Sequence, residues 1–309
     1  MKIYKPKFWT KNYHTFLSII LLPISFFYQL LIYLKKLKTR ERRFSIPIIC
    51  IGNIYIGGTG KTPLAIKLFK LFKEKKKVVV IKKDYKNQKD EIDLLKKHTK
   101  VISCKKREYG IIESVKKGFD LVILDDGYQD FSIKKNINIV CFNNEQKIGN
   151  GQTIPSGPLR QRLSSLNNCD IVMINGKKNY EFEEKLKIHN KKLNFFYFNY
   201  FPEKLDQLKN RKLIAFAGIG NPENFFSILK LNRLNIIKEL SFPDHYNYTQ
   251  NDLDSLVELE KKYNAKLVTT EKDFLRISKY NRGNITYVPI TLKIDNENEF
   301  TDLVDKILK

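Results

Sequence analysis

A glycine-rich loop between a strand-like run and a helix-like run constrains this chain most. The loop consists of Tyr55-Ile56-Gly57-Gly58-Thr59-Gly60-Lys61-Thr62. It follows the apolar residues 46–51 and precedes the amphipathic residues 65–72, as expected of a loop at a helix N-terminus. In such a loop the backbone N–H groups surround phosphates, the lysine reaches the β- and γ-phosphates, and the threonine hydroxyl can bind Mg²⁺. The loop therefore predicts a nucleoside triphosphate site, although Tyr55 stands where the strict motif has its first glycine.

Two adjacent carboxylates end a second apolar run. Residues 121–124 are followed by Asp125, Asp126 and Gly127. In P-loop proteins an acidic residue at such a strand end holds the Mg²⁺ that bridges the β- and γ-phosphates. A solvated turn is the alternative for the pair alone, but the upstream loop favours a metal site formed with Thr62. The sequence leaves open which aspartate is the ligand.

The rest of the chain alternates short apolar runs with helical patterns. Strands are predicted at 46–51, 78–81, 100–103, 120–124, 137–142 and 170–174, with helices at 65–72 and 109–117. This rhythm is typical of a parallel sheet covered on both faces, so the predicted fold class is α/β. A polar loop spans 149–162, and residues 194–206 are predicted to be a connector. A second α/β unit follows, with strands at 212–217, 236–240, 265–269 and 285–289 and helices at 223–231 and 252–263.

The N-terminal region is apolar and then basic. Residues 16–34 carry no charge, and a basic cluster occupies residues 35–43. The apolar stretch is only just long enough for a transmembrane helix, and the basic cluster favours the cytoplasmic side and attracts anionic head groups. A buried core helix is the alternative. We predict membrane attachment but leave open whether the segment crosses the bilayer, because Pro23 allows a bend. The predicted domains are an anchor (1–38), a P-loop domain (39–200) and a smaller α/β domain (201–309).

The charge and the cysteines add weaker constraints. The 309 residues carry a formal net charge of +24, which indicates an anionic partner such as nucleic acid, a membrane surface or a phosphorylated substrate. Because lysine, asparagine and isoleucine are abundant throughout, the charge alone decides little. The four cysteines lie far apart without C-x-x-C spacing. They are expected to be reduced and mostly buried, as in a chain that faces the cytoplasm.

A kinase also needs a group that accepts the proton of the acceptor hydroxyl. Among the four histidines, His245 is the best placed, because Ser241-Phe-Pro-Asp-His-Tyr follows a predicted strand of the second domain. An ordinary loop histidine is the alternative.

These motifs and several others, in the same order along the chain, resemble the tetraacyldisaccharide 4′-kinases of lipid A synthesis. The resemblance is carried by Gly52-Asn53, Gly57-Gly58-Thr59-Gly60-Lys61-Thr62-Pro63, Asp125-Asp126-Gly127-Tyr128-Gln129, Gly149-Asn150-Gly151, Pro155-Ser156-Gly157-Pro158-Leu159-Arg160, Ala217-Gly218-Ile219-Gly220-Asn221-Pro222, Phe242-Pro243-Asp244-His245 and Thr270-Glu271-Lys272-Asp273. It implies two nucleotide-fold domains with an N-terminal membrane helix, and an active site between the domains. It also implies transfer of the γ-phosphate of ATP, with Mg²⁺, to the 4′-hydroxyl of a tetraacylated glucosamine disaccharide 1-phosphate at the cytoplasmic face of the bacterial inner membrane.

The resemblance further assigns catalytic roles. The family's catalytic aspartate lies in a Gly-Asp-Glu-Pro motif, which here reads Lys89-Asp90-Glu91-Ile92. The resemblance implies that Asp90 takes that role and that His245 pairs with it. Lys61 would contact the β- and γ-phosphates. From the residues alone, Asp90 would be an exposed carboxylate in a charged loop.

The remaining predicted site residues, and the positions where this sequence differs from the family's motifs, concern substrate binding. Contacts to substrate or phosphate groups are predicted for Tyr85, Arg107, Gln129 and Arg160. Arg107 and Arg160 match arginines of the family that it resembles, and a guanidinium suits bidentate phosphate binding. The family usually has Ser-Arg-Gly before the tyrosine, whereas this chain has Lys82-Lys83-Asp84. Gln161 and Asp130 replace a common acid and a common histidine. These departures put the details of the substrate loops in doubt.

The leading hypothesis is therefore an ATP-dependent lipid kinase whose partners are an anionic glycolipid and a membrane surface, with no nucleic acid. The alternative is a membrane-tethered P-loop NTPase that acts on nucleic acid or as a switch. Against it, the sequence has no recognisable nucleic-acid-binding module, and residues 270–273 only partly match the guanine-reading Asn-Lys-x-Asp motif. A catalytically impaired relative is a third possibility, and the oligomeric state is left open.

Overall fold

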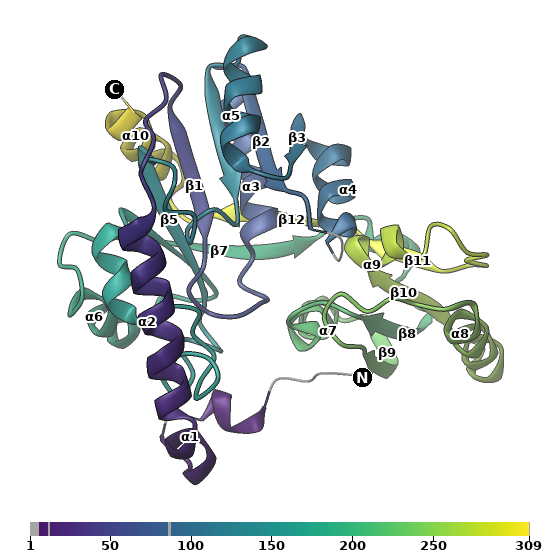
Figure 1. Ribbon diagram of the computed structural model, residues 1–309. Helices are drawn as coiled ribbons and strands as arrows, with labels where there is room; N and C mark the ends of the chain where they lie inside the picture. The colour runs from purple at the N-terminus through teal and green to yellow at the C-terminus, as the bar shows by residue number, and fades with distance from the viewer. Residues whose placement is uncertain (1–5, 12, 86–87, 309) are drawn as a thin grey trace. The chain divides into compact units, whose positions relative to one another are not determined.

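The computed structural model describes residues 6–11, 13–85 and 88–308, which form two compact units (Figure 1). The larger unit comprises the described residues of Tyr4–Asp84, His98–Asn199 and Lys293–Lys309. The smaller unit comprises those of Tyr85–Lys97 and Tyr200–Leu292. The division thus differs from the predicted boundary at 200/201, because the segment after β2 groups with the smaller unit and the C-terminal helix groups with the larger one.

An eight-stranded sheet forms the core of the larger unit, in the order β12-β7-β6-β5-β1-β4-β2-β3. The pairings from β7 to β3 are all parallel. The strands are β1 (Ile48–Gly52), β2 (Val78–Lys83), β3 (Val101–Cys104), β4 (Leu121–Asp125), β5 (Ile137–Asn143), β6 (Ile171–Asn175), β7 (Asn194–Pro202) and β12 (Ile290–Ile294). The strands β1, β4, β5 and β6 are mainly apolar and almost fully buried, as expected of a sheet covered on both faces.

Helices cover this sheet. They are α3 (Lys61–Phe72), α5 (Arg107–Lys116), α6 (Tyr180–Lys187) and α10 (Glu297–Leu308). The helix α3 packs against β1, β2 and β4, and it buries Leu64, Leu68 and Phe72. The helix α10, yellow in Figure 1, packs near β5 and buries Phe300 against Phe196, with the ring centroids 5.2 Å apart.

Two α-helices cover the uncharged segment 16–34, for which membrane attachment was predicted and crossing of the bilayer was left open. They are α1 (Phe16–Ile20) and α2 (Leu22–Lys38), and Leu21 separates them. Among the described residues, no helix combines the length and the apolar character that crossing a membrane requires.

A four-stranded parallel sheet, β11-β10-β8-β9, forms the smaller unit. Its strands are β8 (Lys212–Ala217), β9 (Asn235–Ser241), β10 (Lys266–Thr270) and β11 (Thr286–Val288), and its helices are α4 (Lys89–His98), α7 (Pro222–Leu231), α8 (Gln250–Tyr263) and α9 (Glu271–Arg276). Local sequence fixes three helix starts. Asn221, Thr249 and Thr270 each accept a hydrogen bond from a backbone N–H of the first turn of α7, α8 and α9 respectively.

The α/β fold with parallel sheets is confirmed, but two local predictions were wrong. Residues 194–206 were predicted to be a connector, whereas Asn194–Pro202 is strand β7, paired with β6. Its aromatic residues are partly exposed, so the strand lacks the continuous buried pattern of its neighbours. From the residues alone Asp90 was placed in a charged loop, whereas it lies in the helix α4. The cysteine prediction is confirmed, since all four are free and three are buried.

Candidate active site

The glycine-rich loop lies between β1 and α3, as the sequence predicted. Gly57, Gly58 and Gly60 have φ angles of 71°, 60° and 85°, a region that side chains disfavour, and this lets the backbone turn tightly into the helix. Asn53 donates a hydrogen bond to Thr59 Oγ1 at 3.0 Å, which ties the loop across its base. Tyr55, at the non-glycine position, packs in the core and is 1% exposed.

Asp125 ends β4 beside this loop. Because β1 and β4 are parallel neighbours with Ile51 opposite Asp125, the carboxyl ends of both strands meet at one edge of the sheet. Thr62 Oγ1 donates to Asp125 Oδ2 at 3.0 Å, and Lys82 Nζ lies 2.9 Å from the same oxygen. The other oxygen, Oδ1, is buried and has no hydrogen-bond partner among the described residues.

The adjacent Asp126 has a left-handed backbone conformation, with φ of 56°. Its carboxylate lies close to two basic side chains. Its Oδ1 lies 3.6 Å from Lys61 Nζ and 3.1 Å from Arg160 Nη1. Arg107 donates to the Asp126 carbonyl and pairs with Asp130 at 3.1 Å. Burial works to raise the pKa of Asp130, but the hydrogen bonds from Ser132 and the charge of Arg107 outweigh it and lower the pKa.

Magnesium fits this arrangement with few protein ligands. Thr62 supplies a hydroxyl, and Asp125 supplies a buried carboxylate oxygen that lacks a partner within the described part of the chain. No cluster of three or more His, Cys, Asp or Glu side chains suited to a metal occurs among those residues. Magnesium commonly binds through one or two carboxylates together with water and substrate phosphates, so the small donor set is compatible with it.

The four predicted substrate contacts have different surroundings. Arg160 belongs to the Asp126 cluster, and its side chain is 26% exposed. Arg107 is 5% exposed and is held by Asp126 and Asp130. Gln129 donates to the Asn53 carbonyl at 2.7 Å, next to the glycine-rich loop. Tyr85 is 39% exposed and belongs to the smaller unit.

The smaller unit contains the predicted aspartate–histidine pair. Asp90 lies in the first turn of α4, and His245 lies in the loop after β9. His245 Nδ1 is 3.3 Å from Asp90 Oδ1, although 155 residues separate the two in sequence. The expectation from the residues alone, an exposed Asp90 in a charged loop, was wrong, because Asp90 is helical and only 7% exposed.

Cations from α9 hold the other side of the Asp90 carboxylate. Arg276 contacts Asp90 Oδ2 through Nη2 at 2.7 Å and Nε at 3.1 Å, and Lys272 Nζ lies 3.4 Å from the same oxygen. Burial works to raise the pKa of Asp90. The hydrogen bond with His245 and the charges of Lys272 and Arg276 outweigh it, so the pKa of Asp90 lies well below its usual range.

A buried aspartate positions Arg276. Asp273 is fully buried; its Oδ2 accepts hydrogen bonds from the Gly218 N–H and from Thr270, and its Oδ1 lies 2.7 Å from Arg276 Nη1. This explains the Thr-Glu-Lys-Asp motif in structural terms, because its residues start α9 and orient the cations that face Asp90.

Sequence reasoning missed Lys82 and Arg276 as site residues. The signal for Arg276 was its position three residues after Asp273, on the same helix face. The signal for Lys82 was its position at the end of β2, where it lies directly opposite Asp125 of β4.

The N-terminal helices contact the rest of the larger unit through polar side chains. Ser25 Oγ donates to the Thr153 carbonyl at 2.8 Å, and Ser18 Oγ donates to the Ser156 carbonyl at 3.1 Å. The opposite face carries exposed apolar residues at helical spacing, each more than half exposed: Ile20, Ile24, Phe27 and Leu31. This is the reverse of an ordinary surface helix, which buries its apolar stripe.

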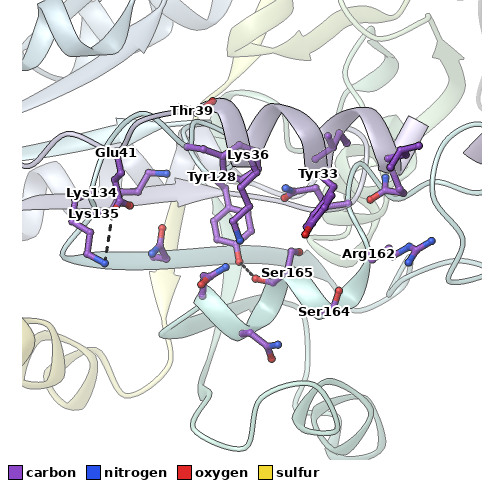
Figure 2. Close-up of a pocket in the computed structure, with 18 of the residues that line it drawn as sticks. Tyr33, Lys36, Thr39, Glu41, Tyr128, Lys134, Lys135, Arg162, Ser164 and Ser165 are labelled. Carbon is purple, nitrogen blue, oxygen red and sulfur yellow. Dashed lines mark hydrogen bonds and ion pairs between the residues drawn. The ribbon is translucent and has the colours of Figure 1, made fainter. Parts of the chain in front are cut away.

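A hollow of about 880 Å³ lies beside α2, between this helix and residues of the segments around 128–138 and 161–168 (Figure 2). Its lining combines apolar residues of α2, among them Phe26 and Leu30, with cations. The cations are Lys36, Lys134, Lys135 and Arg162. Tyr128 and Ser165 also line it, and the Tyr128 hydroxyl donates to the Ser165 carbonyl at 2.6 Å.

A glycine-rich loop between strand and helix, with a threonine and an aspartate pair at the same sheet edge, defines a P-loop phosphotransferase of the α/β class. The sequence matches a model of the tetraacyldisaccharide-1-P 4′-kinase family, LpxK, over residues 17–309. It is 41% identical over 311 residues to the tetraacyldisaccharide 4′-kinase of Pelagibacter ubique and 35% identical over 326 residues to that of Rickettsia felis. The alignments cover 99% of this chain and 99% and 98% of those proteins.

A solved structure described as LpxK from Aquifex aeolicus in complex with ATP has the same fold. Its TM-score is 0.70 at 24% identity, and the match covers 95% of this chain and all of that one. The chain belongs to the tetraacyldisaccharide-1-P 4′-kinase family, which confirms the resemblance seen in the sequence. It is an ATP-dependent kinase that phosphorylates the 4′-hydroxyl of a lipid A precursor.

Proposed function

We propose that Asp90 and His245 form the proton-accepting unit of this kinase, while the glycine-rich loop and the Asp125–Asp126 pair hold the nucleotide and its metal. The observation that carries the proposal is the contact between His245 Nδ1 and Asp90 Oδ1 at 3.3 Å. Two residues that lie 155 positions apart in sequence meet at a buried carboxylate in a fold of the kinase family.

The nucleotide half of the proposal rests on the larger unit. The N–H groups of residues 55–62 surround the phosphates of ATP, and Lys61 neutralises charge that develops on the β- and γ-phosphates. Thr62, Asp125 and Asp126 would hold Mg²⁺, which in this class of enzyme neutralises charge on the bridging phosphate oxygens. Arg160, which is partly exposed beside Lys61, is the second cation available to the transferred group.

The acceptor half rests on the smaller unit. Arg276 occupies Asp90 Oδ2, so Oδ1 is the oxygen that faces His245. With its low pKa, Asp90 is ionised at neutral pH and can accept a hydrogen bond from the 4′-hydroxyl. A base of low pKa is a weak proton acceptor. The hydrogen bond with His245 helps to keep Asp90 ionised and holds its Oδ1 in place for the 4′-hydroxyl. His245 therefore acts as a positioning and tuning residue for Asp90.

The N-terminal helices suit attachment to a membrane surface. An apolar stripe that faces away from the protein, next to the basic residues 35–43, matches an interfacial helix that lies on an anionic leaflet. We place the protein at the cytoplasmic face of the bacterial inner membrane, with α1 and α2 in the head-group region. The polar contacts of Ser18 and Ser25 hold the helices to the protein while the apolar stripe stays available to lipid.

The hollow beside α2 is the proposed place for part of the glycolipid. Phe26 and Leu30 offer apolar surface for an acyl chain, and Lys134, Lys135 and Arg162 offer charge for the 1-phosphate. The combination of apolar wall and cations matches a substrate that carries both groups.

A transfer assay tests the function. The purified full chain is incubated with ATP labelled in the γ-phosphate and with tetraacyldisaccharide 1-phosphate in mixed micelles, and the position of the new phosphate is determined. We expect label on the 4′-oxygen, and far less label with Lys61→Ala. ATP turnover that nucleic acid stimulates, with no lipid product, would instead support the alternative P-loop NTPase.

A further inference from the structure

Lys82 occupies an unusual place for a lysine. It lies at the carboxyl end of β2, where the register of the parallel pair β2–β4 sets it opposite Asp125. Both side chains are completely buried, and the ammonium lies 2.9 Å from Asp125 Oδ2. A buried ammonium is strongly unfavourable without a partner, so the position of Lys82 depends on the charge of Asp125.

The pairing affects the proposed metal site directly. Asp125 Oδ2, which lies next to the Lys82 ammonium, also accepts the hydrogen bond of Thr62. A fixed positive charge therefore lies beside both of the residues, Thr62 and Asp125, that are proposed to hold the metal. A divalent cation that approaches Asp125 meets an ammonium that is itself completely buried. The carboxylate therefore offers less net attraction than an unpaired aspartate would.

The carboxylate of Asp126 is also close to positive charges. Asp126 pairs with Lys61 and Arg160, so each of the two aspartates carries at least one cation. Lys61 is also the residue proposed to reach the phosphates of ATP. Nucleotide binding would draw Lys61 away from Asp126 and add phosphate oxygens as ligands, whereas Lys82 would stay with Asp125.

We propose that Lys82 is a fixed counter-charge for Asp125 that keeps divalent cations out of the nucleotide-free protein, so that the metal binds only together with nucleotide. The inference rests on the nucleotide and metal sites of the proposed function. It makes Lys82 a positioning residue, which acts on the metal through Asp125. Where relatives carry a neutral residue at this place, the same carboxylate would attract metal without nucleotide.

Binding of Mn²⁺ provides the test, because it is measured without turnover. Free Mn²⁺ is followed by electron paramagnetic resonance during titration of the full-length protein, with and without the nucleotide analogue AMP-PNP. For the wild type we expect binding at least about tenfold tighter with AMP-PNP, since a counter-charge and missing ligands both weaken nucleotide-free binding. Lys82→Met should bind Mn²⁺ without nucleotide about tenfold more tightly than the wild type.

Two variants serve as controls. Lys82→Arg keeps the charge and should keep the weak nucleotide-free binding. Lys83→Met removes a lysine from the next position of β2, whose side chain points to the opposite face of the sheet, and should leave Mn²⁺ binding unchanged.

The outcomes separate this inference from the proposed function. Equal Mn²⁺ affinity in Lys82→Met and the wild type would overturn it, provided that both bind AMP-PNP. A wild type that binds Mn²⁺ equally well with and without AMP-PNP would also overturn it, and this arm needs no variant to fold. A wild type that does not bind AMP-PNP at all would instead refute the nucleotide site itself.

Discussion

Arg276 places two nitrogens on one oxygen of Asp90, with Nη2 at 2.7 Å and Nε at 3.1 Å. This contact leaves the other oxygen of Asp90 to His245 and helps to hold the pKa of Asp90 low. The arginine is in turn fixed by the buried Asp273, so the orientation of the carboxylate is set from within the fold of the smaller unit.

The low pKa of Asp90 predicts a specific dependence of stability on pH. Below about pH 4, the usual pKa of an unfolded aspartate, the unfolded chain binds a proton at Asp90 that the folded chain does not. The stability due to Asp90 is therefore present above that pH and is lost as the pH falls towards the folded pKa. Urea unfolding at pH 5 and pH 3 should show a smaller loss of stability for Asp90→Asn than for the wild type. Asp93→Asn, an exposed change on the same helix, is the control. An equal loss in all three proteins would contradict the prediction.

Lys61→Ala should lower kcat/KM for ATP by about 10²-fold or more, because it removes a preorganised charge from the developing negative charge of the phosphates. The folded state should survive, since Lys61 is partly exposed and lies at the first position of α3. Steady-state kinetics with circular dichroism as the folding control checks both statements. A folded variant with near-normal turnover would show that the glycine-rich loop takes no part in phosphoryl transfer.

Asp126→Ala should impair turnover in a way that added Mg²⁺ partly restores. The change removes one proposed metal carboxylate and leaves Lys61 and Arg160 without their partner. Asp125→Ala should have a different signature, because it also removes the carboxylate that lies 2.9 Å from the buried Lys82 ammonium and should therefore lower the melting temperature. Titration of activity with Mg²⁺ and thermal unfolding distinguish the two. Wild-type metal dependence in both folded variants would place the metal elsewhere.

The outward stripe of α1 and α2 should carry membrane binding. Replacement of Ile20, Ile24, Phe27 and Leu31 by serine removes apolar surface that is already exposed, so folding should be little affected. Flotation with anionic vesicles should then show weaker binding that salt abolishes, because only the basic residues 35–43 remain. Ile188→Ser and Leu231→Ser, at apolar positions elsewhere that are even more exposed, are the control. Salt-resistant binding of the fourfold variant would mean that another surface attaches to lipid.

The sequence predicted those parts of the structure that local patterns encode. Continuous apolar runs gave the strands β1, β4, β5 and β6 to within a few residues, and the glycines of the loop marked the turn into α3. The Asp125–Asp126 pair was found for the same reason, since a strand and its end are a local feature.

The rest depends on contacts between distant segments. Asp90 lies in a highly charged stretch, and nothing nearby in sequence indicates that His245 and Arg276 bury it. Lys82 was noticed only as a departure from a family motif. Its meaning depends on the register between β2 and β4, which places it on Asp125. Strand β7 was missed because its mixed exposure resembles a connector.

The central claim is that Asp90 and His245 act as one unit in accepting the proton of the 4′-hydroxyl, and a double-mutant cycle tests it most directly. Asp90→Ala and His245→Ala should each lower kcat by about 10²- to 10⁴-fold with little change in ATP affinity. The double variant should be scarcely slower than the slower single one, because residues that act together are not additive. Fully additive losses, or normal kcat in a folded Asp90→Ala protein, would contradict the account.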